Sequence, residues 1–121
     1  MGDKQFRFQD LEIWNRAAGV SGMLFKLTDS LEGRKLFRFA EQLRGATLSI
    51  MNNIAEGSGS VSDADFASFL NFARRSVFEV VNMLVLLKRD GYLGEADVSG
   101  LLNELEEQSM RILAFHRRLK P

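Results

Sequence analysis

The sequence predicts an all-α fold: a single-domain, antiparallel four-helix bundle with up-down-up-down topology. Three observations support this prediction. Apolar residues recur at intervals of three and four in four segments, the breaks between those segments are short, and no segment alternates with a period of two for long enough to form a strand. Helices joined by short loops pack as antiparallel neighbours. We expect one domain over residues 1–121, with helices over about 9–27, 34–56, 63–90 and 95–119.

The first helix is predicted over residues 9–27, with Asp10 as its N-cap. The segment Thr28–Gly33 is expected to break the chain before the second helix. The apolar stripe of this first helix consists of Leu11, Trp14, Ala17, Ala18, Leu24 and Phe25.

The second helix, over residues 34–56, has the most regular apolar spacing of the four. Gly57 follows it, where a left-handed residue would end a helix, and we interpret Gly57–Ser60 as a loop. The stripe consists of Leu36, Phe39, Ala40, Leu43, Ala46, Thr47, Ile50 and Ile54.

The third helix is predicted to begin after Ser62, an N-cap residue followed three positions later by Asp65, and to end at Gly91. Its core stripe consists of Phe66, Phe69, Leu70, Ala73, Val77, Val80, Leu84 and Leu87. The fourth helix carries Val98, Leu101, Leu102, Leu105, Ile112, Leu113, Phe115 and Leu119 at the same kind of spacing.

Composition excludes several function classes. The chain has 16 Lys and Arg against 16 Asp and Glu, one His and no Cys, so it can form neither a disulfide scaffold nor a Cys-ligated or His-pair metal site. No catalytic constellation and no cofactor motif is present; Gly57–Ser60 lacks the ending of a P-loop, and His116 fits a partly exposed residue near a helix end. We therefore expect a non-enzymatic protein without a cofactor. The absence of a signal peptide or membrane segment favours a cytoplasmic location.

The third helix is more apolar than one core face requires. Five residues extend its apolar arc beyond the core stripe: Phe72, Phe78, Val81, Met83 and Val85. They are predicted to form an interface between subunits of a homo-oligomer, since a large apolar patch left in water promotes aggregation. The alternative is a wide core face on a central helix.

Polar residues interrupt the second and third helices at Asn52, Asn53, Glu56, Glu79 and Asn82. A buried polar group needs a hydrogen-bond partner, and Arg44 is the expected partner of Glu79 or Glu56. We interpret these residues as a network that fixes helix register or subunit packing; a ligand pocket is the functional alternative.

Basic residues cluster although the net charge is zero. The candidate nucleic-acid contacts are Arg34, Lys35, Arg38, Arg74, Arg75, Arg117, Arg118 and Lys120. Ordinary solvated helix faces are the alternative interpretation, because cations are also favoured at helix C-termini.

Four motifs resemble a known family, the small bacterial 23S rRNA intervening-sequence proteins. The opening segment Phe8–Ala17 is similar to the start of that family, and Gln42–Gly57, which ends Asn53-Ile-Ala-Glu-Gly57, is similar to its central signature. The third helix matches at Phe66, Phe69-Leu70, Ala73, Ser76 and Glu79, and Gly91-Tyr92-Leu93 follows as in the family.

The resemblance implies a four-helix bundle that assembles as a homopentamer, in a family whose biochemical role is not established. The accessory proteins of diversity-generating retroelements are similar in fold; they are basic pentamers that bind nucleic acid and a reverse transcriptase. The motif residues carried over are Arg44, Ser49, Asn53, Glu56, Ser76 and Glu79. The resemblance implies that they form a packing and hydrogen-bond network. This chain departs from the pattern at Gly45, which replaces an Arg, and in the Gly57–Ser60 turn, which lacks an Arg.

The sequence therefore predicts a non-enzymatic oligomeric bundle that binds RNA or a ribonucleoprotein. One alternative is a protein-interaction scaffold or accessory subunit without nucleic-acid contact. A small-molecule or catalytic pocket around Glu56 and Glu79 is a third hypothesis.

Overall fold

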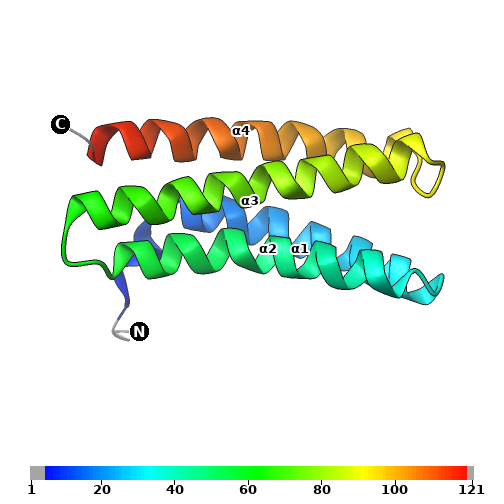
Figure 1. Ribbon diagram of the computed structural model, residues 1–121, viewed down its shortest axis with the longest axis horizontal. Helices are drawn as coiled ribbons and strands as arrows, with labels where there is room; N and C mark the ends of the chain where they lie inside the picture. Colours follow the sequence, from blue (N-terminus) through cyan, green and yellow to red (C-terminus); the bar gives the residue numbers. More distant parts are fainter. Residues whose placement is uncertain (1–4, 120–121) are drawn as a thin grey trace.

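The computed structural model describes residues 5–119, and over these residues it consists of four long α-helices preceded by one turn of 3-10 helix. The elements are η1 (Arg7–Asp10), α1 (Glu12–Gly33), α2 (Phe37–Ser58), α3 (Asp63–Arg89) and α4 (Glu95–Leu119). Figure 1 shows the four helices lying lengthwise beside one another, with consecutive helices running in opposite directions. The prediction of an all-α, antiparallel four-helix bundle is confirmed.

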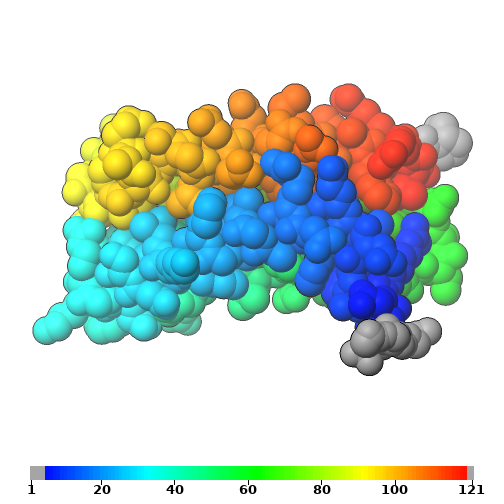
Figure 2. Space-filling model, turned by 180° about the vertical axis from the view of Figure 1, so that it is seen from behind, coloured from blue at the N-terminus to red at the C-terminus, as the bar shows by residue number. Residues whose placement is uncertain are grey.

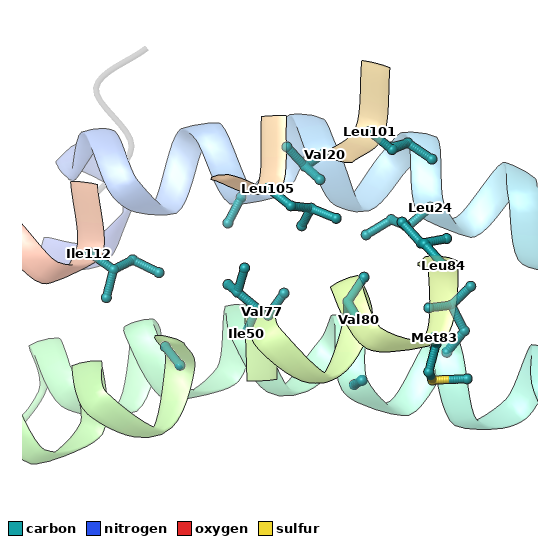
Figure 3. Close-up of a cluster of buried hydrophobic side chains, with 14 of the residues drawn as sticks. Val20, Leu24, Ile50, Val77, Val80, Met83, Leu84, Leu101, Leu105 and Ile112 are labelled. Carbon is teal, nitrogen blue, oxygen red and sulfur yellow. The ribbon is translucent and has the colours of Figure 1, made fainter. Parts of the chain in front are cut away.

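The core runs along the whole bundle and receives side chains from every helix. Figure 3 shows Leu24 of α1, Ile50 of α2, Val77 and Leu84 of α3 and Leu105 of α4 pointing toward one another. Leu24, Val77, Leu84 and Leu105 are fully buried. Burial of one such side chain stabilises the fold by about 1.5–3 kcal/mol, so the apolar stripes supply most of the driving force for folding.

Helix α1 is longer than expected, because the predicted break at Thr28–Gly33 is helical. Thr28 and Leu31 are both fully buried and continue the stripe of Leu24 at helical spacing. The Thr28 hydroxyl donates to the Phe25 carbonyl at 2.7 Å and so satisfies itself inside the helix. The prediction of Asp10 as N-cap is also wrong: Asp10 ends η1, and Leu11 precedes α1 without a side-chain cap.

Helix α1 ends in a turn that uses a non-glycine residue in the left-handed region, Lys35 at φ 65°. The Leu36 amide donates to the Leu31 carbonyl at 2.9 Å, and the Lys35 amide donates to the Glu32 carbonyl at 2.9 Å. These two bonds form a Schellman motif. Helix α2 consequently begins at Phe37, not at residue 34, and Arg34 and Lys35 lie in the turn.

Gly57 does not end α2 as a left-handed residue. It is buried inside the helix, which continues to Ser58, and its carbonyl accepts a hydrogen bond from the Ser60 amide. A Cβ at position 57 would lie 2.7 Å from Phe69 Cβ and 2.8 Å from Phe66 Cδ1. Glycine is therefore present because α2 and α3 approach closely here.

Both ends of α3 agree with the sequence analysis. The Ser62 hydroxyl accepts a hydrogen bond from the Asp65 amide at 3.1 Å, which confirms the N-cap. Gly91 follows the last turn at φ 83°, and the Tyr92 amide donates to the Leu87 carbonyl at 2.9 Å. This Schellman motif stops the helix, and α4 begins four residues further on.

Helices α1 and α4 close the bundle. They lie side by side on the face that Figure 2 shows, and polar contacts join them along this seam. Gln108, which is 1% exposed, donates from Nε2 to the Ile13 carbonyl at 2.9 Å. Arg111 binds Glu12 at 2.7 Å, and Arg16 lies 3.3 Å from Glu104. Gln108 Oε1 and Arg16 Nε are buried without a hydrogen-bond partner among the described residues.

Candidate functional site on helix α3

Three residues of the sequence-predicted polar network meet between α2 and α3. Ser49 Oγ of α2 lies 2.8 Å from Ser76 Oγ of α3. Asn53 Nδ2 donates to the Ser49 carbonyl at 2.8 Å and to Ser49 Oγ at 3.1 Å. The spacing of four residues places Asn53 one turn after Ser49 on the same face of α2. This cluster joins α2 to α3 through side-chain contacts.

Arg44 does not join this cluster. Its guanidinium binds Glu32 at 2.9 Å and Asp29 at 2.7 Å, both on α1, instead of Glu79 or Glu56. The expectation of an Arg44 pair with Glu79 or Glu56 is therefore wrong. The carboxylates of Glu32 and Asp29 accept hydrogen bonds from the Arg44 guanidinium, Glu32 having the larger effect, and so raise the pKa of Arg44. Sequence spacing alone did not reveal this pairing, because Asp29 and Glu32 were assigned to a break and not to a helix facing α2.

Glu56 and Glu79 are both exposed, and no ion pair or side-chain hydrogen bond involves either carboxylate among residues 5–119. Glu79 nevertheless lies beside the serine pair. A groove of about 440 Å³ between α2 and α3 is lined by Ser49, Asn53, Phe72, Arg75, Ser76 and Glu79. Polar residues that were predicted separately on two helices thus form one concave surface.

The predicted subunit-interface residues fall on both sides of α3. Phe72 is 47% exposed on the side toward α2, whereas Phe78 and Val85 are 55% and 49% exposed on the side toward α4. Val81 is half-buried. The expectation for Met83 is wrong, since its side chain is 8% exposed and belongs to the core in Figure 3.

An apolar groove of about 470 Å³ lies between α3 and α4. The α3 wall includes Phe78, Val81 and Val85, and the α4 wall includes Leu102 and Met110. Met110 is 58% exposed and is not among the interface residues predicted from the sequence. Its position outside the apolar stripe of α4 was the signal that could have identified it.

The candidate nucleic-acid contacts lie in three separate places. Arg34, Lys35 and Arg38 are at the α1–α2 turn, where Arg34 donates to the Tyr92 carbonyl of the α3–α4 turn. Arg117 and Arg118 are at the far end of α4. Lys120 lies outside the described residues.

Arg74 and Arg75 occupy the middle of α3. Arg74 donates from Nε to the Ser109 carbonyl at 3.2 Å, and its guanidinium lies 5.0 Å from the centre of the Phe78 ring. No carboxylate forms an ion pair with either arginine among residues 5–119. Both side chains therefore keep hydrogen-bond donors for a further partner.

His116 is partly buried, and its Nδ1 lies 2.9 Å from the Ala67 carbonyl, so it links α4 to α3. Among residues 5–119, no three His, Cys, Asp or Glu side chains are grouped to hold a metal ion. None of the helices over the same range combines the length and hydropathy that crossing a membrane requires.

The family model of the 23S rRNA-intervening sequence protein matches residues 9–114. A crystal structure of a protein of unknown function, from the S23 ribosomal protein family of Bacteroides thetaiotaomicron, superposes with a TM-score of 0.82. The two sequences are 24% identical, and the alignment covers 90% of this chain and 99% of that one. Among curated proteins, none matches significantly. The structural likeness covers 90% of the chain and supports the fold.

Proposed function

Because the chain belongs to the family of 23S rRNA-intervening sequence proteins, we propose that it is a non-enzymatic bundle that forms a homo-oligomer and binds RNA. The observation that carries the proposal is the outward surface of α3. There, apolar side chains that are about half exposed lie beside arginines without a carboxylate partner among the described residues: Phe72, Arg74, Arg75, Phe78 and Val85. Apolar atoms in water favour a protein neighbour, and free guanidinium groups favour phosphate.

A second copy of the chain would cover the apolar groove between α3 and α4. Phe78, Val85 and Met110 each expose about half of their surface there. Removal of this apolar surface from water is worth about 25 cal/mol per Å² and supplies the driving force for association. The family resemblance implies five copies in the assembly.

RNA binding would use cations that the fold leaves free. Arg44 and Arg111 each bind two carboxylates, so the ion pairs of residues 5–119 neutralise more carboxylates than cations. An oligomer presents the same unpaired cations once in every copy, so several sets of them can contact one RNA. Since the net charge of one chain is zero, we expect binding of moderate strength that falls steeply as salt rises.

Light scattering tests the oligomer. Val85→Glu places a charge in the α3–α4 groove and should dissociate the assembly. Leu48→Glu is the matched control. Leu48 is 48% exposed and Val85 is 49% exposed, but Leu48 lies on α2, which contributes no residue to the groove. A monomeric wild-type chain, or equal effects of the two variants, would refute this interface.

Filter binding to a structured RNA across a salt series tests nucleic-acid binding. Arg75→Glu on α3 and Arg117→Glu on α4 should each weaken binding and reduce the slope of log K against log salt. Lys26→Glu makes the same charge change on α1, outside the candidate contacts, and should have a smaller effect. No binding at low salt, or equal effects of all three variants, would contradict the proposal.

The groove between α3 and α4 also favours a second candidate function, a scaffold for another protein. Its volume of about 470 Å³ and its apolar walls suit the apolar face of an amphipathic helix. A monomeric chain that co-purifies with one stoichiometric protein and no nucleic acid would favour this function over the first.

A further inference from the structure

The polar groove between α2 and α3 is a different surface from the apolar groove between α3 and α4. Its volume is about 440 Å³, and its floor is the cluster of Ser49, Asn53 and Ser76. Its remaining walls come from Phe72, Arg75 and Glu79 of α3. Concave surfaces with a few convergent polar groups are typical ligand sites.

The floor holds an amide in a fixed orientation. The Ser49 carbonyl can only accept a hydrogen bond, so the group 2.8 Å from it must be the amide nitrogen of Asn53. The same nitrogen makes a second contact, to Ser49 Oγ at 3.1 Å. Asn53 Oδ1 is left as an acceptor without a partner among residues 5–119.

The walls supply one anion, one cation and one flat apolar surface. Glu79 and Arg75 are exposed and form no ion pair among the described residues. Phe72 exposes 47% of its surface. The groove thus combines two kinds of hydrogen-bond acceptor, a guanidinium donor and an aromatic ring.

We propose that this groove binds an unstacked guanine nucleotide of single-stranded RNA, which rests on the RNA binding proposed above. Sequence-specific proteins read such bases by stacking them on aromatic rings and bonding their Watson–Crick edges. Phe72 stacks on the base, and the Glu79 carboxylate accepts from guanine N1–H and N2–H. Arg75 binds a neighbouring phosphate.

The chemistry of the acceptors selects guanine among the four RNA bases. Guanine presents two adjacent N–H donors on its Watson–Crick edge, which match the two oxygens of one carboxylate. Adenine and cytosine each present a ring-nitrogen acceptor beside the amino group, and uracil presents a single N–H between two carbonyls. The two grooves share no lining residue, so a copy bound only in the α3–α4 groove does not contact the residues that line this one.

The test is fluorescence anisotropy of the wild-type protein with labelled RNA hexamers that differ at one position. We expect 5′-UUGUUU to bind about tenfold more tightly than 5′-UUAUUU. The same hexamer with inosine, which lacks the 2-amino group, should bind with intermediate affinity. Unlabelled GMP as competitor distinguishes the sources of the base: competition as strong as that of the hexamer would overturn RNA as the ligand in favour of the free nucleotide.

Variants assign the preference to the groove. Glu79→Gln should abolish the preference for guanine, because a carboxamide has one acceptor oxygen in place of two. Glu41→Gln, an exposed glutamate of α2 that does not line the groove, is the control and should leave the preference intact. Phe72→Leu should weaken all hexamers equally, and Arg75→Gln should lower the salt slope by about one.

Several results would overturn the site while leaving the proposed function standing. One is RNA binding with no preference among the hexamers, and another is a preference that Glu79→Gln leaves unchanged. If Glu79→Gln instead dissociates the oligomer in light scattering, the groove is an interface between copies and not a nucleotide site. Absence of all RNA binding at low salt refutes the proposed function itself. Circular dichroism confirms that each variant is folded.

Discussion

Gly57 packs directly against Phe69: a Cβ at position 57 would lie 2.7 Å from the Phe69 Cβ. Two helix backbones are thus as close as side chains allow, at the point where α2 turns into α3. Adding a methyl group to a core that is already closely packed typically costs about 1–3 kcal/mol. A Cβ atom is fixed to the helix backbone, so neither the added Cβ at position 57 nor that of Phe69 could move away without a shift of its helix.

Gly57→Ala should therefore lower the free energy of unfolding by about 1–3 kcal/mol, measured by urea denaturation. Gly45→Ala on the same helix is the matched control, because a Cβ at position 45 would meet nothing within 4 Å. We expect this control to stabilise the protein by about 0.5–1 kcal/mol, the usual gain from replacing a helical glycine. Equal effects of the two substitutions would contradict the close approach.

The two turns at the opposite end of the bundle use the same motif with different residues. Lys35 and Gly91 both occupy the left-handed position after a helix, at φ 65° and 83°. A residue with a Cβ loses about 1–2 kcal/mol in this conformation. Lys35→Gly should raise stability by about 1 kcal/mol, and Gly91→Ala should lower it by a similar amount. Thermal unfolding of both variants checks the signs, and a destabilising Lys35→Gly would show that the lysine side chain makes a needed contact.

The sequence was sufficient to predict the four helices, because each has an apolar stripe with helical spacing. It failed where local signals and packing disagree. Thr28 and Gly33 are typical of a break, yet the burial of Leu31 keeps α1 helical between them. Gly57 is typical of a helix end, yet its role is set by Phe69 of another helix. Contacts between helices cannot be deduced from the spacing within one.

The candidate site was predicted in composition but not in arrangement. Ser49, Asn53 and Ser76 were expected to form a network, and the structure brings their polar groups together. The prediction that Arg44 joins the same network rests on the suitability of arginine for pairing with a buried carboxylate, that of Glu79 or Glu56. The structure places Arg44 on the other face of α2, against α1. Rotation of one helix about its axis decides such a choice, and sequence alone does not specify it.

The hydroxyl pair between α2 and α3 should couple the two helices energetically. Ser49→Ala and Ser76→Ala each remove one partner of the 2.8 Å contact and leave the other hydroxyl with one fewer hydrogen bond. A double-mutant cycle should give a coupling energy of about 0.5–1.5 kcal/mol. If the effects of the two substitutions on the free energy of unfolding are additive, water replaces the lost partner and the pair does not help to fix the register of α2 against α3.

Arg44 should stabilise the α1–α2 pair in a manner that depends on salt and not on pH near neutrality. Because the pKa of Arg44 is raised in the folded state, its contribution to stability is fully present at pH values below the pKa of this arginine in the unfolded chain. The contribution is lost only as pH rises through the higher pKa of the folded state. Between about pH 6 and pH 9 the arginine is charged in both states. Arg44→Gln should lower Tm by an amount that is constant over this range and shrinks toward about 1 M salt, where the Debye length is about 3 Å. Arg89→Gln, at an exposed arginine, is the control. A difference that is unchanged by salt would contradict an ionic origin.

Gln108 should be replaceable by an apolar residue at little cost. It is 1% exposed, its Nε2 donates to the Ile13 carbonyl, and its Oε1 has no partner among residues 5–119. A buried acceptor without a partner costs about 1–3 kcal/mol, which offsets the bond that Nε2 makes. We expect Gln108→Leu to change the free energy of unfolding by less than about 1 kcal/mol.

Gln108→Glu should be destabilising with a defined pH dependence. Burial penalises the carboxylate, so the folded-state pKa of the new glutamate would exceed its unfolded value. The folded chain then binds more protons than the unfolded chain between the two pKa values, and stability falls as pH rises through that window. Urea titrations of Gln108→Glu and Gln108→Leu at pH 4 and pH 7 would measure the difference. Gln108→Leu should show no such additional loss. If the two variants respond to pH identically, solvent reaches position 108 and the α1–α4 seam is open there.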